Sequence, residues 1–367
     1  MLAAAFAAIS VAFWALQYSG VGAATVLGGA SWHGHEMLFG YAFAVIGGFL
    51  FTAVRNWAQR PTPSGWTLAA IVALWVAGRV LVLTPHPMAA AIVNALFPLA
   101  IAIGIGIPLV QGGNRRNYFF IALLVGASAI VLAFHLARMG RIDWPERAGL
   151  QAGLDIVLFV IAVVAGRVIP MFTNNGVPGA GATRNAWVER ASLGGILALI
   201  AADVVGIDGS PLAVLALAVA TAHLARLALW RPLRTLRTPL VWVLHASYAW
   251  IAVHLALRAL AEWGMVAAPL AVHALTIGAI GGMTIGMMTR TARGHTGRPL
   301  VADRYEVACY ALVQLAAIVR VVGGLAFPSA YLQSVWISAA LWCAAFTLYV
   351  VRYWPVLTRP RIDGKPG

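Results

Sequence analysis

The sequence predicts an all-α integral membrane protein, a polytopic bundle of about twelve transmembrane helices. Hydrophobic residues make up 62% of its 367 residues and charged residues only 10%, whereas soluble globular domains carry roughly a quarter charged residues. Apolar runs of the length that spans a bilayer, about 20 residues, recur along the chain between Arg, Pro and Gly residues. The hydrophilic connections between these runs are short, so they leave no room for a soluble catalytic domain.

The apolar runs define the expected spans in chain order. They cover residues 2–19, 35–54, 66–84, 89–110, 118–138, 149–171, 189–207, 211–230, 239–260, 267–289, 304–326 and 331–353. The first run has neither the basic leading segment nor the cleavage site of a signal peptide, so we expect it to be a membrane helix. Residues 1–367 are therefore expected to form a single transmembrane domain.

The basic residues predict the orientation of this domain. If both termini are cytoplasmic, 19 of the 25 Lys and Arg residues lie on the inner side, from Arg55 to Lys365. The six expected on the outer side are Arg79, Arg138, Arg141, Arg147, Arg258 and Arg320. Because cytoplasmic connections are enriched in Lys and Arg, this bias supports twelve spans with both ends inside. The same loops explain the net charge of +14, and we expect no nucleic-acid partner.

Five or six of the nine histidines are expected to gather toward the outer leaflet, and four of them are the most informative. His33 and His35 lie at the outer end of the second span, while His254 and His273 lie at similar depth in the ninth and tenth spans. Ionisable residues inside a span are rare and often functional, although hydrogen bonding between helices is a competing explanation. Imidazole is a good ligand for iron, copper and zinc, so these four residues are candidate metal ligands.

The other five histidines lie near the membrane boundaries or, like His245, deeper in a span, where an ionisable residue is often functional. His86 and His135 fall near the outer boundary, where a histidine is most often a polar cap at the level of the lipid headgroups. His245 lies deeper in the ninth span, and His223 lies near the inner end of the eighth. His295 lies in an inner connection, where it is either a second site or an interfacial anchor.

Two local patterns add to the histidine set. Glu36 follows His35 directly, and its carboxylate would accept a proton from an imidazole and fix the tautomer, as carboxylates behind metal ligands do. Gly278, Gly282 and Gly286 form a stripe of small residues in the tenth span. Such a stripe favours close helix packing, and it would also accommodate a flat porphyrin ring.

Other chemistries find no support in the sequence. The chain contains no Walker loop, no GxSxG motif and no HExxH motif, which argues against nucleotide-driven and hydrolytic functions. A histidine-rich centre in a membrane bundle without acidic clusters is typical of haem, copper or both.

Four blocks of this sequence resemble the signature of the NnrS proteins. The first is Trp32-His-Gly-His-Glu-Met-Leu-Phe-Gly-Tyr-Ala-Phe-Ala-Val-Ile-Gly-Gly-Phe-Leu-Phe-Thr-Ala-Val54. The second is Gly166-Arg-Val-Ile-Pro-Met-Phe-Thr-Asn174, and the third is Leu244-His-Ala-Ser-Tyr-Ala-Trp250. The fourth runs from His273-Ala-Leu-Thr-Ile-Gly-Ala-Ile-Gly281 through Met288-Thr-Arg290 to Gly294-His-Thr-Gly-Arg298.

The resemblance implies a twelve-span membrane protein of the bacterial inner membrane that contains haem b and copper. It also implies a link to nitric oxide and nitrosative stress. The positions that match the family pattern are His33, His35, Glu36, Arg167, His245, Tyr248, His273, Arg290 and His295. Of these, the resemblance implies that cofactor binding falls to His35, Arg167, His245, Tyr248 and His273.

The resulting hypothesis is a redox or gas-handling metalloprotein. Haem b would be held by His35 and His273, with His33, His245 or His254 as candidates for copper or for a second ligand. Nitric oxide or a related small gas would be the ligand, and the lipid bilayer would surround the protein. An electron donor would be a further partner if the protein turns nitric oxide over. The alternative is a membrane transporter or sensor that uses intramembrane histidines without redox chemistry.

Overall fold

The computed structural model describes residues 1–21 and 28–364, and all regular structure within them is helical. The expected all-α fold is therefore confirmed, while Lys365, counted above on the inner side, lies outside the described residues. Each of the twelve expected spans coincides with a helix to within a few residues at most ends.

Nine helices of the described residues are long and apolar enough to cross a membrane, which identifies a multi-pass membrane protein. They are Gly29–Ala58, Pro87–Gln111, Arg115–Arg138, Glu146–Gly176, Gly209–Leu229, Pro239–Glu262, Ala268–His295, Arg304–Ala326 and Pro328–Leu357. The helices at the other three expected spans are Leu2–Tyr18, Gly65–Leu81 and Ala186–Val205. Length and composition alone therefore support fewer crossings than the twelve expected.

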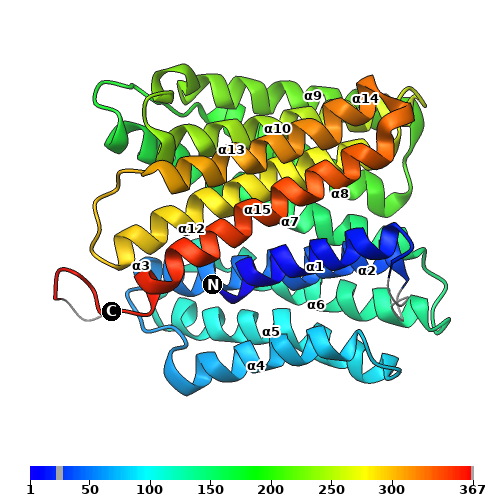
Figure 1. The fold of residues 1–367 in the computed structure, drawn as a ribbon, viewed down its shortest axis with the longest axis horizontal. Helices are drawn as coiled ribbons and strands as arrows, with labels where there is room; N and C mark the ends of the chain where they lie inside the picture. Colours follow the sequence, from blue (N-terminus) through cyan, green and yellow to red (C-terminus); the bar gives the residue numbers. More distant parts are fainter. Residues whose placement is uncertain (22–27, 365–367) are drawn as a thin grey trace. The chain divides into compact units, whose positions relative to one another are not determined.

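The chain folds into two compact units, which we call the first bundle (Leu16–Val160) and the second bundle (Met1–Ala15 with Ile161–Gly367). The expectation of a single domain stays a prediction. The helices of the first bundle are α2 (Gly29–His35), η1 (Glu36–Ala42), α3 (Phe43–Ala58), α4 (Gly65–Leu81), α5 (Pro87–Gln111), α6 (Phe119–Arg138) and the first part of α7 (Glu146–Gly176). Within this bundle, α5 packs against α3, α4 and α6 (Figure 1).

The second bundle is built around α10. Its helices are α1 (Leu2–Tyr18), the second part of α7, α8 (Ala186–Val205), α9 (Gly209–Leu229), α10 (Pro239–Glu262), α11 (Ala268–His273), η4 (Ala274–Gly281), α12 (Gly282–His295), α13 (Arg304–Ile318), η5 (Val319–Gly323), α14 (Gly324–Ala326) and α15 (Tyr331–Leu357). Helix α10 packs against α9, α11, η4, α12 and α13. The N-terminal α1 lies on α15, where the indole N–H of Trp342 donates to the carbonyl of Ala7 at 3.0 Å.

Three π-helical segments interrupt the described helices, and each coincides with a polar residue of interest. Segment η1 begins directly after His35, η4 begins directly after His273, and η5 contains Arg320. A π-helical turn widens the helix by one residue and is found frequently at functional sites. These three positions are therefore candidate functional positions.

The glycine stripe of η4 and α12 is a packing surface. A Cβ atom added at Gly278 would collide with the indole of Trp250, and one added at Gly282 would collide with Ser247. Because side chains of α10 already fill this face, it offers no open platform for a porphyrin ring. Of the two explanations for the stripe, close helix packing is the one that the structure supports.

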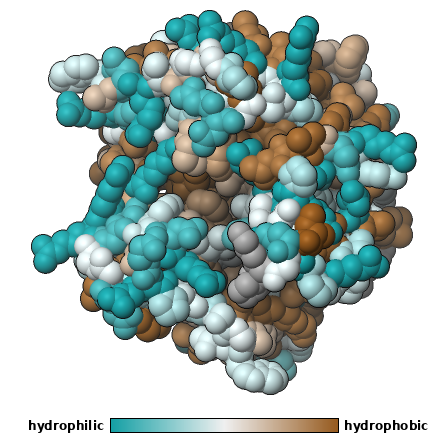
Figure 2. All heavy atoms as spheres, turned by 90° about the vertical axis from the view of Figure 1, so that its left-hand side faces the viewer, coloured by the Kyte–Doolittle hydropathy of each residue, from teal (hydrophilic) through white to brown (hydrophobic). Residues whose placement is uncertain are grey.

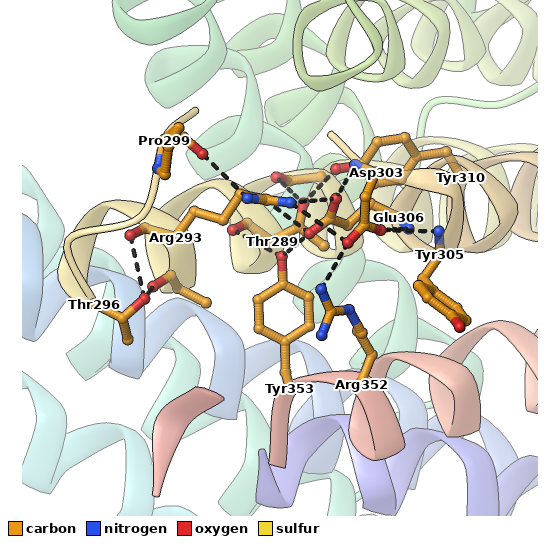
Figure 3. Close-up of polar contacts among 12 residues, drawn as sticks. Thr289, Arg293, Thr296, Pro299, Asp303, Tyr305, Glu306, Tyr310, Arg352 and Tyr353 are labelled. Atoms are coloured by element: carbon orange, nitrogen blue, oxygen red, sulfur yellow. Dashed lines mark hydrogen bonds and ion pairs between the residues drawn. The ribbon is translucent and has the colours of Figure 1, made fainter. Parts of the chain in front are cut away.

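A polar cluster fastens α12, α13 and α15 at one end of the second bundle (Figure 3). Glu306 is buried, and it accepts hydrogen bonds from Arg293 Nε at 2.8 Å and from the Tyr353 hydroxyl at 2.5 Å. Asp303 caps the N-terminus of α13 by accepting from the backbone N–H of Tyr305, and it also accepts from Arg352. The cluster satisfies its own charges, so it is a structural clamp.

Exposed charged side chains lie at the ends of helices in the first bundle. Figure 2 shows a face on which hydrophilic side chains gather, with hydrophobic side chains flanking them. In the first bundle, exposed arginines lie at the C-terminal ends of α3 and α5, which meet where the Asn114 amide donates to the carbonyl of Trp57. They are Arg55, Arg60, Arg115 and Arg116. Charged helix ends around apolar flanks are expected of a chain that crosses a bilayer.

Candidate functional site

Two histidines that lie a hundred residues apart in the sequence meet inside the first bundle. Nε2 of His35 is 3.0 Å from Nε2 of His135, and both side chains are buried. The two rings meet edge to face, with their centroids 4.9 Å apart. Phe39 and Phe134 pack against the His35 ring. Two imidazole nitrogens therefore face each other in apolar surroundings.

A carboxylate fixes the tautomer of His35. Nδ1 of His35 lies 2.7 Å from Oε1 of Glu36, and a carboxylate can only accept a hydrogen bond. In the neutral imidazole, Nδ1 therefore carries the proton, and Nε2 presents its lone pair toward His135. The same oxygen of Glu36 accepts from Arg79 Nη1 at 3.0 Å, and Arg79 also donates to the side chain of Asn94.

The local sequence explains how His35 reaches this position. His35 ends α2, and Glu36 begins the π-helical η1, so both side chains lie on the buried face. Gly34 allows the helix to approach Leu150, whose Cδ1 atom would lie 3.0 Å from an added Cβ. His33 is half-buried, and it does not complete a set of three ligands with His35 and His135.

A cavity of about 300 Å³ reaches His135 from one end of the first bundle. It lies between the C-terminal ends of α4 and α6 and the start of α5, and His135 forms part of its wall. The lining residues are Leu81, Val82, Thr84, Pro87, Ala90, His135, Arg138 and Met139. The walls are mainly apolar, so the cavity suits a small neutral molecule.

Two further candidate histidines lie in the second bundle with their Nδ1 atoms engaged. Nδ1 of His254 donates to the carbonyl of Ala271 at 2.8 Å, and Nδ1 of His273 donates to that of Pro269 at 2.6 Å. His254 is buried, and its Nε2 atom has no hydrogen-bond partner. A ring held through Nδ1–H with a free Nε2 is the usual state of a metal-binding histidine.

The remaining predicted cofactor residues lie elsewhere in the second bundle. His245 is buried and lies 2.8 Å from the hydroxyl of Thr173, through its Nε2 atom. The Tyr248 hydroxyl is 2.7 Å from Nδ1 of His223 and accepts from Arg226 at 2.9 Å. Arg167 is half-buried on α7. None of these contacts joins the residues to His254 or His273.

Arg226 organises this second polar region. Its guanidinium is fully buried, and it forms two hydrogen bonds with Glu189, from Nε at 2.9 Å and from Nη2 at 2.6 Å. Nη1 also donates to the carbonyl of Ala162 at 2.8 Å. Gly166 makes room for this arrangement, because a Cβ atom there would collide with the guanidinium. The glycine that begins the second sequence block thus has a packing reason.

Metal binding by three or more protein ligands finds no support in the part of the chain that the structure describes. No group of three His, Cys, Asp or Glu side chains there could hold one ion. His35 and His273 belong to different bundles, so their joint ligation of one haem stays a prediction. The closest pairing of imidazole nitrogens described above is that of His35 with His135.

Sequence reasoning did not identify several residues of these sites. His135 was assigned to the headgroup level, but it is buried against His35. Arg79 and Arg320 were counted as charges on the outer side, yet both side chains are buried. The available signal was that both arginines lie inside apolar runs, where a charged residue needs a partner.

The fold and these sites define a multi-pass helical membrane protein with histidine centres inside its bundles. The family model for the NnrS protein matches residues 1–361. The chain therefore belongs to the NnrS family. A search of the curated proteins found no match.

Proposed function

We propose that this NnrS chain is a haem- and copper-binding protein of the bacterial inner membrane that acts on nitric oxide or protects against nitrosative stress. The observation that carries the proposal is the buried pair of His35 and His135, with their Nε2 atoms 3.0 Å apart. Family membership and the neighbouring cavity add support.

The donor set of the pair fits copper in its reduced state. Imidazole suits copper, and copper(I) accepts two ligands, whereas zinc usually takes four. Metal–imidazole bonds are about 2.0 Å long, so the pair has to open by roughly 1 Å. His35 would bind through Nε2, because Glu36 holds its Nδ1 proton. Copper there would supply a redox-active coordination position for a small ligand.

His273 and His254 are the residues that fit a haem iron. Each has its Nδ1 atom bonded to a backbone carbonyl, which leaves Nε2 for an axial bond. This assignment separates the two cofactors, with copper in the first bundle and haem in the second. His35 is then a copper ligand and not the haem ligand expected from the sequence, because its Nε2 atom is directed at His135.

The chain's own residues would control the access of the gas to the copper centre. The cavity leads to His135 between apolar walls, which exclude charged solutes but admit a small neutral molecule such as nitric oxide. Arg79 forms a 3.0 Å ion pair with Glu36 and so fixes the position of its carboxylate. Glu36 in turn orients the His35 ring, so the pair stays aligned when the cavity is filled.

The alternative function is a membrane transporter or sensor that uses intramembrane histidines without redox chemistry, and its proton-coupled form finds less support. Buried carboxylates that carry protons in transporters need to change partners. Glu36 pairs with Arg79, Glu306 pairs with Arg293, and the half-buried Glu189 pairs with Arg226. A further buried carboxylate, Asp155, accepts a hydrogen bond from the side chain of Gln151 at 2.8 Å. Paired carboxylates of this kind are suited to fixing a structure.

We further propose that the chain crosses the membrane twelve times, with both termini in the cytoplasm and the histidine pair toward the periplasm. The one-to-one match between expected spans and helices supports this. Of the six arginines expected outside, Arg79 and Arg320 are buried and Arg258 pairs with Asp203. The outer side is therefore poorer in free positive charge than the sequence count suggested.

Purified full-length protein tests the proposal directly. We expect a Soret band and bound copper, with copper lost in His35→Ala and in His135→Ala, and the Soret band lost or shifted in His273→Ala. His86→Ala is the matched control, because His86 is exposed in the same bundle as the pair. Wild-type protein that holds neither copper nor haem would refute the proposal. Nitric oxide consumption with a reductant then separates a reductase from a binding protein.

A further inference from the structure

One buried arginine in the second bundle lacks a negative partner. The Arg320 side chain is 4% exposed, and its Nη2 donates to the hydroxyl of Tyr331 at 2.6 Å. The guanidinium also lies over the Tyr331 ring, 4.5 Å from its centroid. Nη1 is buried and has no hydrogen-bond partner. No carboxylate among residues 1–21 and 28–364 forms an ion pair with it.

The other buried arginines among the described residues make this one unusual. Arg79 and Arg226 each pair with a glutamate, as does the half-buried Arg293. A guanidinium cannot lose its proton at any physiological pH, so burial cannot neutralise Arg320. Leaving such a charge uncompensated costs several kcal/mol. The position is therefore explained if an anionic group that is not part of the chain completes it.

Arg320 lies beside His273. The π-helical η5 packs against α11, and Val321 shares a hydrophobic cluster with Ala271 and Ala274, which flank His273 closely in sequence. Arg320 is also near enough to His273 to interact with it electrostatically. A ligand on the free side of the His273 ring would thus come within reach of the guanidinium.

We propose that Arg320 and Tyr331 bind a carboxylate beside His273. Nη1–H of Arg320 is one donor, and the Tyr331 hydroxyl is the second, because it accepts from Nη2 and still has its own hydrogen to donate. Two donors side by side match the two oxygens of a carboxylate. Where the carboxylate is a propionate of haem, this inference rests on the proposed function. A free carboxylate would use the same donors.

The first experiment compares haem with its dimethyl ester in titrations of the full-length protein prepared from haem-depleted cells. Wild type should bind the free-acid haem at least about tenfold more tightly than the ester. Arg320→Leu should bind both equally and weakly, and Tyr331→Phe should lie between. Equal binding of haem and ester by wild type, or haem binding by Arg320→Leu as tight as in wild type, would overturn the inference.

Thermal unfolding provides a second readout that a purely structural role would not reproduce. Without haem, Arg320→Leu should raise the Tm, because it removes an uncompensated charge. With haem, the same variant should lower it. Arg258→Leu is the matched control, since Arg258 is paired with Asp203 in the same bundle and should lower the Tm in both states. A lower Tm of Arg320→Leu in both states would mean that Arg320 is structural.

Sodium formate separates this inference from the haem proposal. If wild type binds no haem, the proposed function fails, and formate decides the inference alone. Formate should then raise the Tm of wild type and leave Arg320→Leu unchanged, with sodium chloride at equal ionic strength as the reference. In a wild type that binds no haem, the absence of a rise in Tm with formate would overturn the carboxylate site. If haem binds as expected but formate has no effect, the carboxylate belongs to haem.

Discussion

Nε2 of His35 lies 3.0 Å from Nε2 of His135, and the opposite nitrogen of His35 is held by Glu36 at 2.7 Å. Glu36→Gln keeps the shape of this side chain but replaces the carboxylate that supports the imidazole. Substitution of a residue that hydrogen-bonds to a metal ligand typically weakens metal binding by about 10- to 100-fold. We therefore expect Glu36→Gln to lower the affinity for copper(I) by that factor, measured by competition with a copper(I) chelator.

Glu146→Gln is the control for this measurement. Glu146 forms a partly exposed ion pair with Arg138 in the same bundle, and exposed pairs contribute little. Its copper(I) affinity should equal that of wild type. Unchanged affinity in Glu36→Gln would separate Glu36 from metal binding and leave it as a partner of Arg79 alone.

Gly166→Ala should destabilise the second bundle. An added Cβ atom would collide with the guanidinium of Arg226, which is held by Glu189 and by the carbonyl of Ala162 and cannot move aside. Overpacking of this kind typically costs about 1–3 kcal/mol. The free energy of unfolding, measured by SDS titration in mixed micelles, should fall by at least that amount.

Gly194→Ala is the matched control, because an added Cβ atom there meets nothing within 4 Å. Alanine favours a helix over glycine by up to about 1 kcal/mol, so this variant should be as stable as wild type or more stable. Equal effects of the two substitutions would show that the Gly166 contact with Arg226 is not responsible.

Removal of Arg226 should be more harmful than removal of the whole ion pair. Arg226→Met leaves Glu189 without the two hydrogen bonds at 2.9 and 2.6 Å and with the exposed Arg184 as an ion-pair partner. Because breaking a fully buried pair costs about 3–5 kcal/mol, the loss should approach but not exceed that range. The double variant Glu189→Met with Arg226→Met removes both charges and should recover part of the loss. A double variant that is no more stable than Arg226→Met would argue against a buried ion pair.

Asp303 should give the α12–α13–α15 clamp a dependence on pH. Partial burial by itself raises the pKa of Asp303, but hydrogen bonds from Arg352 and from the backbone N–H of Tyr305 and Glu306 outweigh it and bring the pKa below its ordinary value of 3.8. The stabilisation is therefore complete above pH 3.8 and is lost as the pH falls through the lowered pKa of the folded state.

Two variants of Asp303 separate its charge from its role as a cap. Asp303→Ala loses both and should destabilise the protein by about 0.5–2 kcal/mol at neutral pH. Asp303→Asn keeps a capping oxygen, so it should lose less. The difference in unfolding free energy between Asp303→Asn and wild type should be constant above pH 3.8 and should narrow as the pH is lowered further through the folded-state pKa. A difference that also stays constant below that pH would exclude titration of Asp303.

The helices were predictable because each depends on its own stretch of sequence. A run of about 20 apolar residues specifies a membrane-length helix whatever lies beside it, and the twelve expected runs coincide with helices. The three π-helical segments were not predictable, because they depend on packing between helices. Gly278 of η4, for example, lies so close to Trp250 of α10 that an added Cβ atom would collide with the indole.

The candidate site was only half predictable. Glu36 is adjacent to His35, so their contact could be inferred from the sequence alone. The contact of His35 with His135 depends on which helices are neighbours, and helical depth does not contain that information. Arg320 shows the same limit, because its position in an apolar run indicates burial but not the missing negative partner.

Copper analysis of the purified protein tests the central claim most directly. Metal content should be measured for wild type, His135→Ala and His86→Ala after copper(I) loading and removal of loosely bound ions. If His35 and His135 hold the ion, wild type and His86→Ala retain one equivalent of copper and His135→Ala retains none. Retention of copper by a folded His135→Ala variant at the wild-type level would contradict the assignment of the histidine pair as the copper site.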